Sequence, residues 1–441
     1  MSANQASAPD PSSERNERSP VVESSKPRLL SILGPGLITG ASDDDPSGIA
    51  TYSQVGAQFG YAPTWTLLFS YPLMAAIQII SGRLGRTTGR GVAGNLRKYY
   101  SSWLVYPCVG LLLIANIINI AADVGAMGDA AKLIIGGPAL LYVMLFGALC
   151  AILQVFLKYK QYVRFLKWLS LALLSYVATL FIVQIDWRAL GYNFFIPHIT
   201  FSADYLTAIV AIFGTTISPY LFFWQASQEV EDLKEKPRRD PLKDHPEQAK
   251  EARQRINLDT LAGMGVSNFI ALSIMVTSAA TLHAHNITDI ASSADAAKAL
   301  EPVAGHFAEV LFALGIVGTG LLAVPVLAGS AAYGLGEALR WPTGLARKPK
   351  DAKAFYVTIA IATLFGAAIN FTAINPIDAL FWSAVINGVI AVPIMIIMML
   401  MSTNREIMGD ETVAGPLKVL GWLSMAAMGL CALGMGASFF L

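Results

Sequence analysis

Residues 31–57 read SILGPGLITGASDDDPSGIATYSQVGA, and this stretch decides the fold. Three carboxylates, Asp43, Asp44 and Asp45, directly precede Pro46 in a segment that is otherwise apolar or small. Proline lacks an N–H and clashes with the preceding turn, so a helix should break at Pro46. Because an aspartate in the middle of a membrane helix costs about 2.5–3.5 kcal/mol, the cluster needs a functional reason.

The composition indicates that this segment lies in a membrane. The chain has 441 residues, of which 54% are hydrophobic and 14% are charged, whereas soluble domains carry about 25% charged residues. These values predict an all-α polytopic membrane protein. The net charge of +1 gives no reason to expect nucleic-acid binding. The three cysteines are far apart in apolar segments, which indicates neither a disulfide framework nor a metal site.

Eleven apolar segments are long enough to cross about 30 Å of hydrocarbon. We expect membrane helices over residues 29–57, 62–80, 102–125, 138–157, 162–184, 203–230, 256–282, 303–335, 354–373, 377–401 and 416–440. Residues 1–28, rich in Ser, Pro and charge, are expected to form a disordered cytoplasmic tail.

Lysine and arginine set the expected orientation. With these eleven segments, all 31 of them except Lys132, Arg188 and Lys298 fall on one side of the membrane. The excess marks the cytoplasmic side. The sequence therefore predicts a cytoplasmic N-terminus and an external C-terminus, in what we expect to be a bacterial inner membrane.

A second break is expected in the sixth segment, where Gly214 and Pro219 bracket the run Thr-Thr-Ile-Ser. Either break alone is typical of helix packing. Together they occupy the first members of two consecutive sets of five helices, which indicates a site between inverted repeats. We expect repeats over 29–184 and 203–401, with 416–440 as an extra helix.

The polarity of the first break predicts a cation site. Free carbonyls at a helix C-terminus and neighbouring carboxylates both attract positive charge. The predicted metal site comprises Asp45, Gly48, Thr215 and Ser218. Candidates for the surrounding pathway are Asp43, Asp44, Ser47, Asn268, Asn387, Tyr220, Gln225 and Asp123.

These motifs resemble those of the Nramp family of divalent-metal transporters. The resemblance rests on Gly34-Pro35-Gly36, on Asp45-Pro46, on Gly60-Tyr61 and on the run from Gly214 to Pro219. It implies a LeuT-like five-plus-five inverted repeat of eleven or twelve helices, with helices one and six discontinuous. It also implies import of transition-metal ions together with protons.

The chain departs from the family pattern at several positions. The family's asparagine ligand falls on Gly48, its methionine ligand on Ser218, and a glutamine on Ala384. Its two sixth-helix histidines fall on Tyr220 and Gln225, and the acidic pair of its third helix is reduced to the region of Asp123. This pattern is similar to the Nramp-related magnesium transporters.

The departures shape the expected function. A thioether favours transition metals, whereas Mg²⁺ is held by oxygen ligands and keeps several waters. We therefore expect import of largely hydrated Mg²⁺, with Mn²⁺ as a second ion and without proton coupling. Alternatives are a proton-coupled Mn²⁺/Fe²⁺ transporter in which Asp123 or Asp44 replaces the histidines, a cation-binding membrane sensor, and an amino-acid transporter. No enzymatic activity, cofactor, nucleic acid or protein partner is expected, only the metal substrate and the lipid bilayer.

Overall fold

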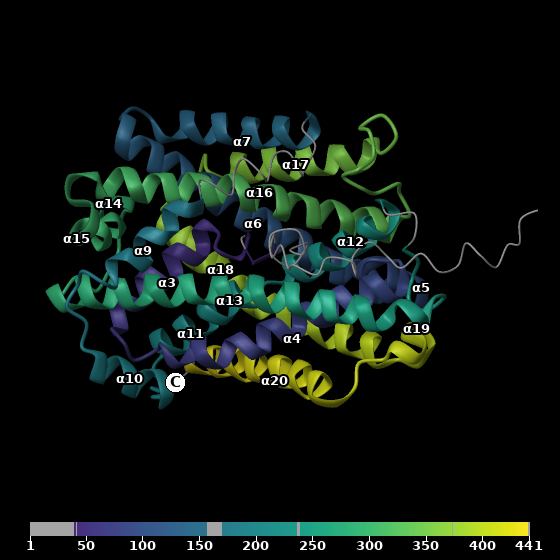
Figure 1. Cartoon of the computed structure of the whole chain (residues 1–441). Coiled ribbons are helices and arrows are strands. Elements are labelled where there is room, and N and C mark those ends of the chain that lie inside the picture. Colours follow the sequence, from purple (N-terminus) through teal and green to yellow (C-terminus); the bar gives the residue numbers. More distant parts are fainter. Residues whose placement is uncertain (1–38, 41, 157–169, 236–238, 373, 440–441) are drawn as a thin grey trace, which may run out of the picture.

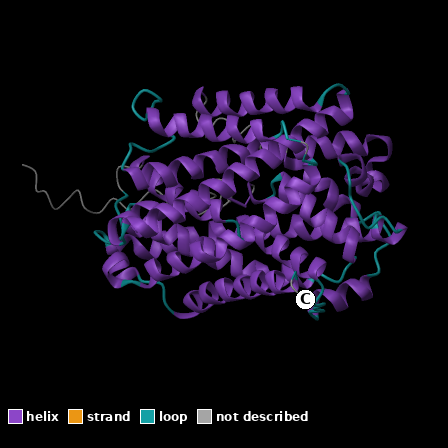
Figure 2. Ribbon diagram, turned by 180° about the vertical axis from the view of Figure 1, so that it is seen from behind, coloured by secondary structure: helices purple, strands orange, loops and turns teal. Residues whose placement is uncertain are grey.

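The computed structural model describes residues 39–40, 42–156, 170–235, 239–372 and 374–439. Within these ranges the chain is helical and contains no strand (Figure 2). The predicted tail over residues 1–28 lies outside the described residues.

The helices follow one another with short connections. The α-helices are α3 (Pro46–Phe59), α4 (Trp65–Thr88), α5 (Val92–Tyr99), α6 (Ser102–Ile135), α7 (Ala139–Phe156), α9 (Leu174–Thr179), α10 (Trp187–Phe195), α11 (Ala203–Thr216), α12 (Pro219–Glu235), α13 (Ala249–Thr281), α14 (Ser293–Ala297), α15 (Glu301–Ala304), α16 (Ala308–Leu339), α17 (Lys353–Ile369), α18 (Pro376–Thr403), α19 (Arg405–Met408) and α20 (Gly415–Ser438). Short 3₁₀ turns are η2 (Ser170–Leu173), η3 (Pro246–Gln248), η4 (His283–His285), η5 (Lys298–Leu300), η6 (Gly305–Phe307) and η7 (Gly409–Glu411).

The predicted membrane helices agree with this element order. Among the described residues, eight helical stretches are long and apolar enough to cross a membrane, with α11 and α12 counted as one. Of the other expected segments, the ninth is the 17-residue α17. The first and fifth fall partly outside the described residues.

Two groups of helices pack against each other (Figure 1). One group contains α6, α7, α16 and α17, and Asn116 of α6 donates hydrogen bonds to the Leu327 carbonyl and the Ser330 hydroxyl of α16 at 2.8 and 2.6 Å. In the other group α3 packs on α13 and α4 on α12. In the most apolar 18-residue stretch of α11 and α12, 94% of the residues are buried, against 22% in the corresponding stretch of α20. The interrupted helix is therefore central and α20 is peripheral.

Small residues allow several helices to approach at backbone distance, as is common between membrane helices. A Cβ placed on Gly214 of α11 would lie 1.9 Å from the Ala384 carbonyl oxygen of α18. A Cβ on Gly56 of α3 would lie 2.3 Å from the Met275 carbonyl oxygen of α13. The two interrupted segments are thus fixed to their neighbours through glycine.

Some connections expected as loops are helical. α10 lies between the fifth and sixth segments, with no buried residue, and Asp186 caps its N-terminus. α13 begins at Ala249, several residues before the predicted start of that segment, because the charged sequence there extends the helix beyond its apolar part. The apolar segment alone therefore underestimates the length of a helix that has a charged end.

Candidate functional site

Both predicted helix breaks are present. The first segment is helical up to Asp43, bends at Asp44 and resumes at Pro46, with Asp45 as the N-cap of α3. The second leaves the helix at Ile217 and Ser218, and α12 begins at Pro219. In each case proline stands at the first position of the new helix, where its missing N–H costs nothing.

Asp45 is the central acid of the first break. Its Oδ1 accepts hydrogen bonds from the Ser47 hydroxyl at 2.7 Å and from the Gly48 amide at 2.8 Å. Its Oδ2 accepts a bond from the Tyr220 hydroxyl at 3.3 Å. One oxygen therefore caps α3, and the other faces the second interrupted segment.

The two breaks adjoin each other. The Tyr220 hydroxyl also donates to the Ser42 carbonyl at 3.0 Å, so the start of α12 contacts the end of the first half-helix. A Cβ on Gly48 would lie 3.0 Å from the Thr215 hydroxyl oxygen. The Ser218 hydroxyl donates to the Gly214 and Thr215 carbonyls at 2.7 and 3.0 Å. The structure thus brings the predicted metal-site residues Asp45, Gly48, Thr215 and Ser218 together.

Asp43 and Asp44 point to a different partner. The Ser267 hydroxyl of α13 lies 2.6 Å from Asp43 Oδ2 and 3.1 Å from Asp44 Oδ1. Sequence reasoning instead proposed Asn268, whose amide donates to the Leu67 carbonyl of α4 at 3.0 Å. The local sequence places both residues in the same helix turn, and only the rotation of α13 determines which of them faces the acids.

Asp123 of α6 approaches the site from the other group of helices. It interacts electrostatically with Asp45 and faces the Ser47 amide. Neither carboxylate oxygen makes a hydrogen bond of ordinary geometry within the described part of the chain. Asp123 is therefore a buried acid whose oxygens remain available to a ligand.

Gln225 and Asn387 are the remaining candidates. Gln225 accepts a bond from the Thr39 hydroxyl at 2.6 Å, which joins α12 to the first half-helix. Asn387 of α18 is 1% exposed, and neither of its side-chain polar atoms has a hydrogen-bond partner among the described residues.

The donor set suits a partly hydrated hard cation. No group of three His, Cys, Asp or Glu side chains in the described ranges is arranged to hold a metal ion. Around the breaks, Asp45 and Asp123 supply carboxylates, and hydroxyl and carbonyl oxygens also lie nearby. Oxygen donors with retained waters are the ligands of Mg²⁺ and of Mn²⁺.

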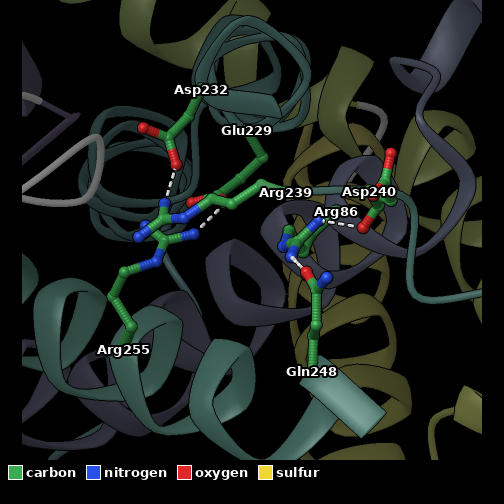
Figure 3. A network of polar contacts seen from close by, with 7 residues as sticks. All are labelled: Arg86, Glu229, Asp232, Arg239, Asp240, Gln248 and Arg255. Atoms are coloured by element: carbon green, nitrogen blue, oxygen red, sulfur yellow. Dashed lines mark hydrogen bonds and ion pairs between the residues drawn. The ribbon is translucent and has the colours of Figure 1, made fainter. Parts of the chain in front are cut away.

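A separate polar network closes the end of α12 (Figure 3). Glu229, fully buried, pairs with Arg255 of α13, and Asp232 pairs with Arg239 of the following connection. Arg86 of α4 donates to the Asp240 carbonyl at 2.5 Å and to Gln248 at 2.7 Å. The described part of the connection between α12 and α13 is therefore packed against the helix ends.

Removing one partner of this buried pair should destabilise the protein. We expect Arg255→Gln to cost about 3–5 kcal/mol, because the buried Glu229 carboxylate loses its compensating charge. The melting temperature of the purified protein in detergent measures the loss. The double variant Arg255→Met with Glu229→Leu should melt closer to the wild type, and a double variant that melts below Arg255→Gln would contradict this account.

The fold and the site define a membrane transporter for a cation, in which two interrupted helices meet at a buried carboxylate. The chain matches the family model described as natural resistance-associated macrophage protein-like over residues 36–438. It belongs to the Nramp family and is a divalent metal cation transporter.

Curated relatives agree with this assignment, and solved structures share the fold. The divalent metal cation transporter MntH of Klebsiella pneumoniae (strain 342) is 25% identical over 412 residues, which cover 90% of this chain and 91% of the relative. The structure of the Eremococcus coleocola manganese transporter has a TM-score of 0.71 at 17% identity, covering 93% and 88% of the two chains. MhsT in complex with L-phenylalanine has a TM-score of 0.59 at 12% identity, covering 92% and 97%. The fold is LeuT-like, as predicted.

Proposed function

We propose that this transporter carries Mn²⁺, accepts Mg²⁺ at the same site, and binds the ion at Asp45 between the two helix breaks. The observation that carries the site is the geometry of Asp45, whose Oδ2 faces the start of α12 while Oδ1 caps α3. Asp43, Asp44 and Asn387 are proposed to belong to the surrounding pathway.

The comparisons support manganese as a substrate, and the oxygen donors of the site support magnesium. The MntH relative is named as a divalent metal cation transporter, and the solved structure of the same fold is named as a manganese transporter. The all-oxygen surroundings of Asp45 suit Mg²⁺ and Mn²⁺ alike, so the missing thioether at Ser218 does not by itself favour magnesium. The magnesium preference expected from the sequence is therefore replaced by shared use of one site.

We also propose that proton movement accompanies the metal, with Asp123 as the proton-accepting group. Asp123 interacts with Asp45 and has no hydrogen bond of ordinary geometry to a described residue. The second candidate is uncoupled Mg²⁺ uptake driven by the membrane potential, which supplies about 2.3 kcal/mol per charge per 100 mV. Its supporting observation is that Tyr220 and Gln225, at the family's histidine positions, are both held in hydrogen bonds.

The proposed orientation follows the charge distribution. The loops that contain nearly all lysines and arginines are placed in the cytoplasm, in a bacterial plasma membrane. The N-terminus is then cytoplasmic and the C-terminus external, and the repeats extend over 29–184 and 203–401 with 416–440 outside them.

Uptake into proteoliposomes tests the substrate and the coupling together. We expect Mn²⁺ to enter, a large excess of Mg²⁺ to slow its initial rate severalfold, and a pH dye in the lumen to report acidification that depends on Mn²⁺. Liposomes with the Asp45→Ala variant provide the background.

Two results would contradict the proposal. Mn²⁺ uptake unaffected by Mg²⁺ would exclude a shared site. Metal uptake at constant luminal pH would exclude the coupling and support the uncoupled candidate.

A further inference from the structure

A cavity of about 550 Å³ lies at the ends of several membrane helices, away from the metal site. Its walls come from the turn after α4, from α5, from the end of α12, and from the end of α16 with the turn that follows it. A volume of this size is within the range of small-molecule sites. The cavity faces the side that the charge distribution assigns to the cytoplasm.

The lining of this cavity is strongly basic. It carries five cationic side chains and one carboxylate: Arg90, Arg97, Lys98, Lys234, Arg340 and Glu337. The carboxylate is already engaged, because Glu337 Oε2 accepts a hydrogen bond from the Gly94 amide of α5 at 2.8 Å. Glu337 also interacts electrostatically with Lys234 and Arg90, but one carboxylate does not balance five cations.

Most of the cations lack a protein counter-charge. Lys234 lies 3.6 Å from Glu231, whereas Arg90, Arg97, Lys98 and Arg340 form no ion pair with any described residue. Arg97 donates through Nη1 to the Ser102 hydroxyl at 2.5 Å, but its Nε is buried without a hydrogen-bond partner among the described residues. A buried guanidinium N–H of this kind requires an acceptor.

We infer that this cavity is a binding site for a phosphate-bearing anion, either the headgroup of an anionic phospholipid or a free polyphosphate. Guanidinium groups bind phosphate oxygens through paired N–H donors, and three of the five cations are arginines. Basic pockets between membrane helices on the cytoplasmic side are suited to lipid headgroups.

Aromatic residues place the cavity at the level of the headgroups. Trp341 lines it and is 36% exposed, and Trp103, which follows the first residue of α6, is 77% exposed. Exposed tryptophans collect at membrane–water interfaces. A bound phosphate would join the ends of α12 and α16, which belong to different groups of helices.

The test uses variants that leave the fold intact. The exposed side chains of Arg90 and Arg340 form no hydrogen bond or salt bridge with any described residue, so the double variant Arg90→Gln with Arg340→Gln should fold. The control is Lys250→Gln with Lys418→Gln, which removes the same charge from two exposed lysines outside the cavity. A third variant, Arg90→Lys with Arg340→Lys, keeps the charge and loses the paired donors.

Two probes distinguish the two sources of phosphate. Full-length protein is titrated with phosphatidylglycerol in phosphatidylcholine nanodiscs, followed by native mass spectrometry, and separately with inorganic pyrophosphate, followed by the melting temperature. We expect the glutamine variant to weaken binding of one probe at least about tenfold, since each basic residue near a membrane surface contributes about 1 kcal/mol. The control variant should bind as tightly as the wild type does. The affinity of the lysine variant should lie between those of the wild type and the glutamine variant.

Each outcome decides the inference. If the glutamine variant loses binding of phosphatidylglycerol alone, the cavity is a lipid site. If it loses binding of pyrophosphate alone, the cavity binds a soluble ligand. Absence of binding by the wild type to either probe overturns the inference, and so does an equal loss in the control variant. Because neither readout measures transport, these outcomes are independent of the proposed metal specificity.

Discussion

Asp45→Asn protein should fold and purify like the wild type and lose at least about a hundredfold in metal transport. Asparagine retains an oxygen for the Gly48 amide, and Asn and Asp are comparable N-caps, so α3 keeps its start. The lost charge matters more, because two unit charges 4 Å apart interact with about 4 kcal/mol at an effective dielectric of about 20. A loss of 1.4 kcal/mol corresponds to a factor of ten in affinity.

Initial uptake rates in liposomes and metal-induced shifts of the melting temperature measure this effect. The shift should disappear in Asp45→Asn, since a ligand stabilises only the state that binds it. Asp204→Asn, in the first turn of α11 and exposed, is the matched control and should transport like the wild type. Normal uptake by Asp45→Asn would remove Asp45 from the site.

The second large effect concerns stability. Gly214→Ala should abolish the recovery of monodisperse protein or lower its melting temperature sharply. The new Cβ would lie 1.9 Å from the Ala384 carbonyl oxygen and 2.6 Å from the Gly388 amide nitrogen. Both are backbone atoms, so α11 and α18 must separate, and the cost should reach or exceed the roughly 1–3 kcal/mol of ordinary overpacking.

Gly110→Ala is the matched control for this substitution. Gly110 lies inside α6, and nothing stands within 4 Å of a Cβ placed on it. Alanine is about 1 kcal/mol more favourable than glycine inside a helix, so this variant should melt at or above the wild-type temperature. Size-exclusion profiles and thermal unfolding in detergent compare the two, and wild-type behaviour of Gly214→Ala would refute the close contact.

The breaks in the helices were predictable because their causes are local. Pro46 and Pro219 remove backbone donors at defined positions, and the acids mark the first break as polar. The membrane segments follow from apolar length alone. These features depend on a few neighbouring residues and do not depend on how the helices rotate in the bundle.

The partners of the site residues were not predictable from the sequence. Ser267, rather than Asn268, faces Asp43 and Asp44 because of the rotation of α13. The pairing of Glu229 with Arg255 joins two helices across the long charged connection. Such pairings depend on the tertiary structure. The sequence of a charged segment does not show whether the segment is solvated or packed.

The metal preference shows a related limit. The absence of a thioether at Ser218 is visible in the sequence, and it excludes one soft ligand. It does not separate two hard cations that both accept oxygen donors. The donor list therefore leaves both ions as candidates, and the competition between Mn²⁺ and Mg²⁺ in uptake distinguishes them.

The distribution of the glycine contacts bears on how access to the ion alternates. Gly56 of α3 meets the α13 backbone, and a Cβ on Gly85 of α4 would lie 2.2 Å from the Ala226 carbonyl oxygen of α12. Both contacts lie within one group of helices, whereas Asp45 and Asp123 meet across the boundary between the groups, without a mutual hydrogen bond of ordinary geometry. These backbone contacts fix α3 to α13 and α4 to α12, so we expect each pair to move as a unit when access to the ion alternates.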